Sequence, residues 1–215
     1  RSEVTPLFRN WWDRVVIAWS PSHRELEEQP LTTAAAKLGK DPVDLALDIS
    51  LADDLQTRFR MAVMNFDEKE VAELITDPHT ISALSDAGAH ANQLCDACYS
   101  THLLGHWVRE KKTLTVEEAV HNLTQRPAEM FGITDRGVLA EGRPADVVVF
   151  DPKTVGPGPL KRVYDLPAGA DRLVAEAGGI DAVIVNGRLI RQNNKDMVAA
   201  NDKLPGRLLR HGRAA

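Results

Sequence analysis

The sequence predicts an α/β fold in two parts: strands that alternate with helices up to residue 135, then a small antiparallel β subdomain over residues 136–215. Short β-branched runs that alternate with amphipathic stretches predict the first part. After Asp135 the strands follow one another closely around an Asn-Gly pair, which is typical of a β-hairpin, and this change predicts the second part.

Hydrophobic periodicity and capping residues define the elements of the first part. Thr32 and Asp41 can each accept a backbone N–H at the start of a helix, and Thr115 with Glu118 has the spacing of a capping box. The expected elements are a strand over 15–19, helices over 33–38 and 42–54, a strand over 59–66, a helix over 68–75, a strand over 80–84, and helices over 99–111, 116–125 and 127–132. This alternation is typical of a parallel α/β sheet or barrel.

The second part is expected to be built from short strands. Asn186 and Gly187 both tolerate positive φ, so they predict a tight turn between two paired strands. Strands are expected over 147–150, 182–185 and 189–190, a loop over 156–159 and a polar tail from 193.

Composition excludes several classes of protein. The chain has 215 residues, of which 43% are hydrophobic and 27% charged, which is typical of a globular protein and not of a disordered one. A net charge of -5 without a basic block argues against nucleic-acid binding, and no apolar run approaches the ~20 residues that span a bilayer. Two cysteines make no disulfide framework, so a cytoplasmic location is expected.

The first candidate for chemistry is Asp86, directly after the strand expected over 80–84. A carboxylate at the C-terminal end of a barrel strand lies where such folds place catalysis, and His90 could reach the same site. The small residues 87–89 would let backbone and ligand approach closely. The alternative is that Asp86 only caps the next helix and that His90 is a surface residue.

The segment Leu84–His90 resembles the last-strand motif of the amidohydrolase superfamily, in the branch of the N-acyl-D-amino-acid deacylases (D-aminoacylases). The resemblance extends over nearly the whole chain. It is also carried by Ala18–His23, Leu114–Val120, Leu123–Ala128, Gly142–Asp151 and Ile184–Gly187. Each of these motifs is weak alone, but those from Ser85 to Asp151 are specific in combination.

The resemblance implies the C-terminal part of a TIM-like (β/α) barrel over residues 1–135, followed by strands of a small β-sandwich subdomain over 136–215. It also implies metal-dependent hydrolysis of a linear amide, with N-acyl-D-amino acids as substrates. One or two divalent ions, usually Zn²⁺, would lower the pKa of a bound water. Asp86 would then be both a metal ligand and the catalytic residue that takes the water's proton and passes it to the leaving amine.

Three further residues are candidates for substrate binding. Ser85 and His90 flank Asp86 in the motif, and His23 follows a predicted strand on a loop that could face the substrate of a barrel. For His23 the alternative is an ordinary loop residue. The expected partner is a small-molecule N-acyl amino acid or related amide, with no nucleic acid and no membrane, and a homo-oligomer is compatible with the sequence.

The chain departs from the family in its metal ligands. The family's first-strand His-x-His pair, its mid-barrel bridging ligand and its two later histidines are absent. The histidines present are His23, His79, His90, His102, His106, His121 and His211. Because a zinc site needs three or four protein ligands, we expect most ligands in a missing N-terminal segment and the chain alone to be inactive.

A different class of function is suggested by Cys95 and Cys98, whose C-x-x-C spacing would suit a thiol redox or metal-binding module. The pair lacks the second cysteine pair of a structural zinc site and the proline of many redox motifs. A third hypothesis is a non-catalytic domain that associates with a separate metal-bearing chain.

Two other sets of residues carry weaker hypotheses. His102 and His106 have a spacing that can bind metal, but Leu103 stands where the zinc-protease motif needs glutamate, so packed or surface histidines are expected. Arg58 and Arg60 alternate along an expected strand and could bind a substrate carboxylate, although a solvated strand face is the more ordinary interpretation.

Overall fold

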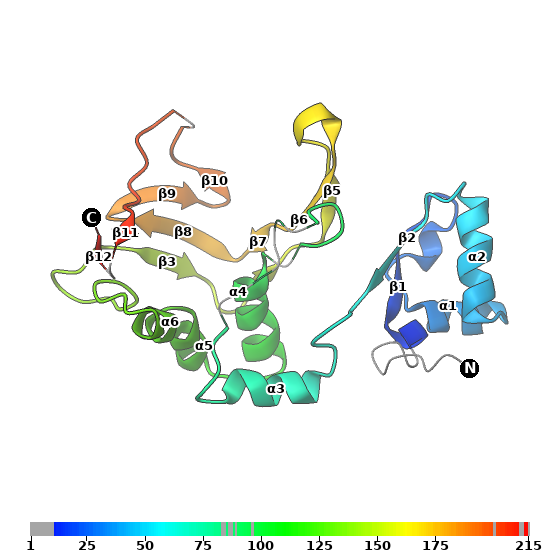
Figure 1. Ribbon diagram of the computed structural model, residues 1–215, viewed down its shortest axis with the longest axis horizontal. Coiled ribbons are helices and arrows are strands. Elements are labelled where there is room, and N and C mark those ends of the chain that lie inside the picture. Colours follow the sequence, from blue (N-terminus) through cyan, green and yellow to red (C-terminus); the bar gives the residue numbers. More distant parts are fainter. Residues whose placement is uncertain are drawn as a thin grey trace. The chain divides into compact units, whose positions relative to one another are not determined.

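Figure 1 shows the computed structural model of the chain. It describes residues 11–82, 85, 88, 90–95, 97–199, 201–210 and 213–214. The chain forms two compact units, Arg1–Val71 and Ala72–Ala215. The domain boundary expected near residue 135 stays a prediction.

The first unit packs two helices against a two-stranded sheet. Its elements are the 3-10 turns η2 (Trp11–Arg14) and η3 (Arg24–Leu26), the strands β1 (Val15–Trp19) and β2 (Arg58–Met61), and the helices α1 (Leu31–Leu38) and α2 (Pro42–Ala52). The core consists of Val15, Ile17, Leu26, Leu31, Ala34, Ala35, Leu45 and Ile49. Ile17 and Leu31 are fully buried, so β1 and the first turn of α1 form its centre.

Strand β2 pairs with β1 in the antiparallel direction, with Val15 opposite Met61. This pairing differs from the parallel arrangement that the alternation of strands and helices predicts. Between β1 and β2 the chain forms two helices, α1 and α2. One helix returns the chain to the end where the strand began, but a second carries it back, so the next strand runs in the opposite direction.

The two helices of this unit begin for different reasons: a capping residue sets the start of α2, and burial of a side chain in the core sets the start of α1. Asp41 caps α2 as predicted: its Oδ1 accepts the N–H of Val43 at 2.8 Å, and Pro42 occupies the first turn. The start predicted for α1 is wrong, because the helix begins at Leu31 and Thr32 makes no cap. Burial of Leu31 extends the helix beyond the point that capping rules indicate.

The second unit begins within α3 (Glu68–Thr76) and continues with α4 (Tyr99–His102), the π-helix η4 (Leu103–Glu110), α5 (Val116–Leu123) and α6 (Gln125–Met130). The predicted helix over 99–111 is thus confirmed, but most of it has the wider π geometry, with Lys111 N–H bonded to the carbonyl of His106 at 2.8 Å. The capping box of Thr115 and Glu118 is present. α6 starts at Gln125, before the predicted start at Pro127, because the first helical N–H groups need no intrahelical partner.

A four-stranded antiparallel sheet forms the main β structure of this unit (Figure 1). Its order is β10 (Lys195–Asp196), β9 (Arg188–Gln192), β8 (Ile180–Val185) and β3 (Val147–Phe150). Asn186 and Gly187 join β8 to β9 with φ values of 45° and 79°, as the hairpin prediction requires.

Three two-stranded ladders complete the unit and correct two predictions. They are β4 (Gly156–Pro157) with β7 (Ala177–Gly178), β5 (Lys161–Val163) with β6 (Arg172–Val174), and β11 (Leu209–Arg210) with β12 (Arg213–Ala214). The expected loop over 156–159 therefore contains a strand, and the expected polar tail contains β10, β11 and β12. β4 depends on a partner about 20 residues away in sequence, which local patterns do not reveal, whereas β10, β11 and β12 form short local pairings without the alternation of apolar and polar residues that predicts strands.

A strand is expected over 80–84, but residues 80–82 form no strand. Residues 83 and 84 lie outside the described residues. The whole is a mixed α/β structure, as predicted. Within the part of the chain that the structure covers, no helix is both long and apolar enough to cross a bilayer.

The capping box of α5 allows a test of helix stability. Thr115 Oγ1 accepts the N–H of Glu118 at 3.1 Å, and Glu118 Oε2 accepts the N–H of Thr115 at 2.8 Å. We expect Thr115→Ala to lower the free energy of unfolding by about 1 kcal/mol in urea denaturation. Thr32→Ala is the matched control, because Thr32 makes no cap, and it should change stability by less than half as much; equal losses would contradict the capping role.

Candidate active site

The predicted catalytic residue Asp86 lies outside the described residues, so its role as base and metal ligand stays a prediction. Of its neighbours, Ser85 is half-buried and has an interaction partner, Gly88 has φ 95°, and His90 has φ 48°. A Cβ on Gly88 would meet no described atom within 4 Å. The positive φ of Gly88 is a backbone conformation that favours glycine, and the close approach of backbone and ligand stays a prediction.

His90 begins a turn at the end of this motif. Its carbonyl oxygen accepts the N–H groups of Gln93 at 2.7 Å and Leu94 at 3.0 Å, and its side chain is exposed. This exposure is expected both for a substrate-binding histidine and for an ordinary surface residue, so the role of His90 stays a prediction.

Cys95 and Cys98 are half-buried, and no disulfide joins them. The Sγ of Cys98 lies 3.8 Å from the carbonyl oxygen of Cys95, at the start of α4. No third ligand joins them, since the described residues contain no group of three His, Cys, Asp or Glu side chains able to hold a metal.

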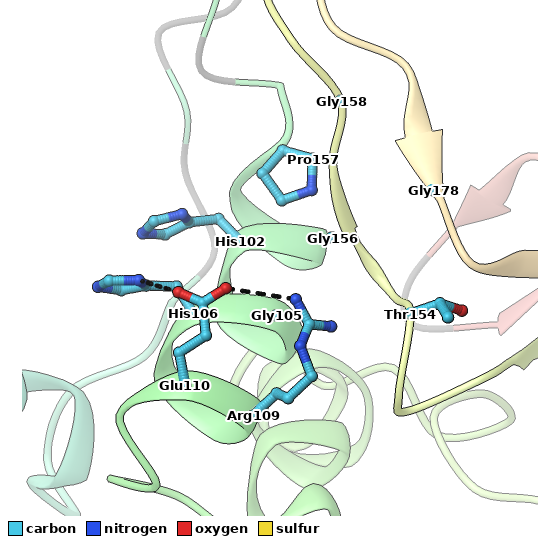
Figure 2. Close-up of a pocket in the computed structure, with 10 residues that line it drawn as sticks. All are labelled: His102, Gly105, His106, Arg109, Glu110, Thr154, Gly156, Pro157, Gly158 and Gly178. Carbon is cyan, nitrogen blue, oxygen red and sulfur yellow. Dashed lines mark hydrogen bonds and ion pairs between the residues drawn. The ribbon is translucent and has the colours of Figure 1, made fainter. Parts of the chain in front are cut away.

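A pocket of about 310 Å³ lies beside η4 (Figure 2). His102 and His106 line it with their rings stacked, 4.8 Å between centroids, and Glu110 Oε2 lies 3.0 Å from Nδ1 of His106. The hydrogen bond from His106 holds the pKa of Glu110 below its usual range. On the other side of the same carboxylate, Arg109 Nη2 lies 3.4 Å from Oε1 (Figure 2).

The pocket wall is a close contact between a helix and a strand. The guanidinium of Arg109 donates to the carbonyl of Val155, and a Cβ on Gly105 would lie 2.8 Å from the same oxygen. The polar groups of this pocket thus bind one another and the backbone. This agrees with the expectation that His102 and His106 are packed or surface groups.

A second polar cluster holds the loop that follows β1. Asp53 is 6% exposed and Ser20 is fully buried. The carboxylate of Asp53 accepts hydrogen bonds from Ser20 Oγ at 2.6 Å and from Thr57 Oγ1 at 2.5 Å. It also accepts the N–H of Ser22 at 3.0 Å and the hydroxyl of Ser22. Burial opposes ionisation, but these hydrogen bonds outweigh it and hold the pKa of Asp53 well below its usual range.

This cluster fixes the backbone next to His23. The N–H of His23 donates to Ser20 Oγ at 3.1 Å, and its Nδ1 lies 3.2 Å from Glu25 Oε1. The side chain remains 38% exposed. His23 belongs to the first unit, whereas Ser85 and His90 belong to the second, so their meeting in one site stays a prediction.

Ser20 and Asp53 were not candidates from the sequence. They lie 33 positions apart, and no spacing rule links a serine after a strand to an aspartate at the end of a helix. The run of small hydroxyl residues around Pro21 is the only local sign of a constrained loop.

The two arginines of β2 both have neighbours within the first unit. Arg60 pairs with Glu28 at 2.8 Å, and the guanidinium of Arg58 lies 5.0 Å from the ring centroid of Trp19. These contacts favour the structural interpretation over a carboxylate-binding role.

Comparison with known proteins decides the family. Residues 7–191 match the amidohydrolase family. The chain belongs to the amidohydrolase family. The predicted resemblance is thereby confirmed.

Curated relatives of this amidohydrolase-family chain include three enzymes of Alcaligenes xylosoxydans xylosoxydans. An N-acyl-D-glutamate deacylase is 35% identical over 202 residues, which are 92% of this chain and 36% of the relative. An N-acyl-D-aspartate deacylase is 29% identical over 94% of this chain and 36% of the relative. A D-aminoacylase is 30% identical over 83% of this chain and 34% of the relative. The chain thus spans about a third of the length of these relatives.

The solved structures that match the chain include the same kinds of enzyme. A crystal structure of D-aminoacylase matches with a TM-score of 0.49 and 26% identity, over 86% of this chain and 36% of the other. The N-acyl-D-glutamate deacylase of Bordetella bronchiseptica matches with a TM-score of 0.48 and 28% identity, over 94% and 38%. These scores do not establish a common fold, and family membership depends on the sequence match.

The Asp53 cluster predicts a pH-dependent stability. Because the pKa of Asp53 is lowered from 3.8, its contribution is complete above that pH and is lost as the pH falls towards the lowered value. We expect Asp53→Asn to lower the melting temperature by several degrees at pH 7, and the difference from wild type to narrow at pH 3.

Asp54→Asn is the control for this measurement. Asp54 is exposed with φ 50°, a conformation that asparagine tolerates, so its replacement should leave the melting temperature nearly unchanged. A difference between wild type and Asp53→Asn that stays constant from pH 7 to pH 3 would show that the carboxylate charge is not what holds the loop.

Proposed function

We propose that this chain is part of a metal-dependent enzyme that hydrolyses the amide bond of N-acyl-D-amino acids. The observation that supports this most strongly is the 35% identity to an N-acyl-D-glutamate deacylase over 92% of the chain. The aspartate deacylase and the D-aminoacylase among its relatives act, by their names, on the same bond with different side chains next to it.

The chain spans 36% of the length of the N-acyl-D-glutamate deacylase. We therefore propose the activity for an enzyme that contains this chain together with the further segments present in that relative. In that enzyme we propose that residues 1–135 supply the C-terminal part of a (β/α) barrel and residues 136–215 a small β subdomain. The antiparallel sheet of β3, β8, β9 and β10 supports the second part of this division. The absence of a disulfide between Cys95 and Cys98 supports the proposed cytoplasmic location, and a homo-oligomer stays a prediction.

A divalent ion, Zn²⁺ by preference, is the proposed cofactor, as the zinc-complexed deacylase of Bordetella bronchiseptica suggests. The described residues do not form such a site, because no three potential ligands come together among them. We therefore expect the chain alone to show no metal-dependent hydrolysis, and no chemical step through a metal is assigned to its described residues.

We propose that Asp86 supplies the proton transfers of the reaction. As a carboxylate it would accept a proton from the attacking water while the new C–O bond forms. Once protonated, it would donate that proton to the amine nitrogen as the C–N bond breaks, so the products are a carboxylic acid and a free amino acid. Ser85, His90 and His23 are proposed to contact the substrate; the exposed side chains of His90 and His23 support this.

The decisive test uses the full-length enzyme with Zn²⁺ and a panel of N-acetyl-D-glutamate, N-acetyl-D-aspartate and a neutral N-acetyl-D-amino acid, each with its L form. Released amine is measured. We expect hydrolysis of at least one D substrate and a loss of kcat of about 10²- to 10⁴-fold in Asp86→Asn, the effect of removing a general acid–base. Wild-type rates in Asp86→Asn would exclude its role.

Cys95→Ser is the matched control in the same segment and also tests the rival function. If the enzyme is a deacylase, this variant should hydrolyse amides at rates near those of wild type. A thiol redox protein would instead lose its activity with Cys95 and release no amine from any substrate in the panel. A chain that only associates with a metal-bearing partner would be insensitive to both substitutions.

A further inference from the structure

The β5–β6 hairpin stands apart from the four-stranded sheet of the second unit. Its strands pair antiparallel, with Arg162 opposite Leu173, and among the described strands they pair only with each other. Figure 1 shows the hairpin, in yellow, extending beyond the sheet. A hairpin of three residues a strand is too short to be stable alone, so its contacts elsewhere are what hold it.

Those contacts reach the segment that follows the Asp86–His90 motif. The N–H of Leu173 donates to the carbonyl of Ala91 at 2.8 Å, and Nη1 of Arg162 donates to the carbonyl of Asn92 at 3.0 Å. The two donors are opposite one another in the hairpin, and the two acceptors are consecutive in the chain. One cross-strand pair therefore holds two successive peptide groups directly after His90.

Arg162 is itself held in place by Asp171. Its Nη1 donates to Asp171 Oδ2, and the two side chains are 19% and 29% exposed. The Nε of Arg162 has no hydrogen-bond partner among the described residues, so the guanidinium acts through Nη1. A charged donor makes a stronger hydrogen bond to a carbonyl than a neutral one does, particularly where water is partly excluded.

The segment that receives these contacts has little structure of its own. The described residues between α3, which ends at Thr76, and α4, which begins at Tyr99, form no helix or strand. Gly88 and His90 both have positive φ, a conformation that regular elements do not use. The position of such backbone must be set by tertiary contacts, and the hairpin supplies two of them.

We infer that the β5–β6 hairpin positions the motif segment for catalysis, and that Arg162 and Asp171 are positioning residues for the reaction assigned to Asp86. The inference rests on the proposed function. Ala91 lies one peptide bond from His90 and five residues from Asp86. A displacement of a catalytic group by about 1 Å can reduce a rate by about 10²-fold, so loosening these two carbonyls is sufficient to impair turnover.

The hairpin contains its own control. Arg172, on the other strand, forms two hydrogen bonds to Asp165, each of 2.7 Å, and these side chains are 42% and 50% exposed. This pair joins β6 to the hairpin tip, and its hydrogen bonds in the described part of the chain do not reach residues 91 and 92. Arg162→Gln and Arg172→Gln thus remove the same charge from the same hairpin, but only the first removes a contact to the motif segment.

The experiment measures two properties of each variant in the full-length enzyme: kcat and KM for the best substrate of the panel, and hydrogen exchange of the backbone amides of residues 88–95. For Arg162→Gln we expect a fall in kcat of about 10- to 100-fold, a smaller change in KM, and faster exchange in this segment. Asp171→Asn should act in the same direction to a lesser extent. Arg162→Lys, which keeps one charged donor, should recover part of the loss, and Arg172→Gln should match wild type in both measurements.

Each outcome decides a different point. Unchanged exchange at residues 88–95 in both Arg162→Gln and Asp171→Asn would overturn the positioning contact. Faster exchange with unchanged kcat would overturn its role in the reaction. Equal losses of kcat in Arg162→Gln and Arg172→Gln would indicate a general effect of hairpin stability and overturn the specific role. An enzyme without deacylase activity would refute the proposed function, while the exchange measurement would still test the contact.

Discussion

Irregular backbone that carries candidate site residues has to be held by hydrogen bonds from elsewhere in the chain, and much of this structure follows from that requirement. After β1 the buried carboxylate of Asp53 meets the requirement, because it accepts the hydroxyls of Ser20, Ser22 and Thr57 and a backbone N–H. After the Asp86–His90 motif the hairpin residues Arg162 and Leu173 do so by donating to two carbonyls. In both places a polar contact between residues distant in sequence fixes the backbone, as the hydrogen bonds of helices and sheets do in regular structure.

The two aspartates of interest differ in what their surroundings allow. Asp53 has its carboxylate oxygens occupied by hydrogen bonds that favour the ionised form, so its pKa is low and it is unsuited to accept a proton near neutral pH. A residue that takes a proton from water and returns it to an amine must pass through both protonation states. The chemistry proposed for Asp86 therefore requires an environment unlike that of Asp53.

Capping and turn rules correctly predicted the helix starts and the turn that depend only on residues close together in sequence. The cap at Asp41, the capping box of Thr115 and the Asn186–Gly187 turn each depend on residues within a few positions, and all three are confirmed. The errors have distant causes. α1 begins early because Leu31 enters the core, β4 exists because Ala177 and Gly178 pair with it, and β2 runs antiparallel because two helices precede it.

The sequence by itself determined the family, because the amidohydrolase motifs from Leu84 to Asp151 depend on residue identity and spacing, and the comparison confirmed it. It also predicted the candidate site residues Asp86, His90, Ser85 and His23, because the reactions that a side chain can support depend on its residue type. Only the tertiary structure revealed that Asp53 fixes the backbone beside His23 and that Arg162 contacts the segment after His90, across 70 positions of sequence. Such contacts arise when folding brings distant donors and acceptors together, and no local pattern encodes which pairs will meet.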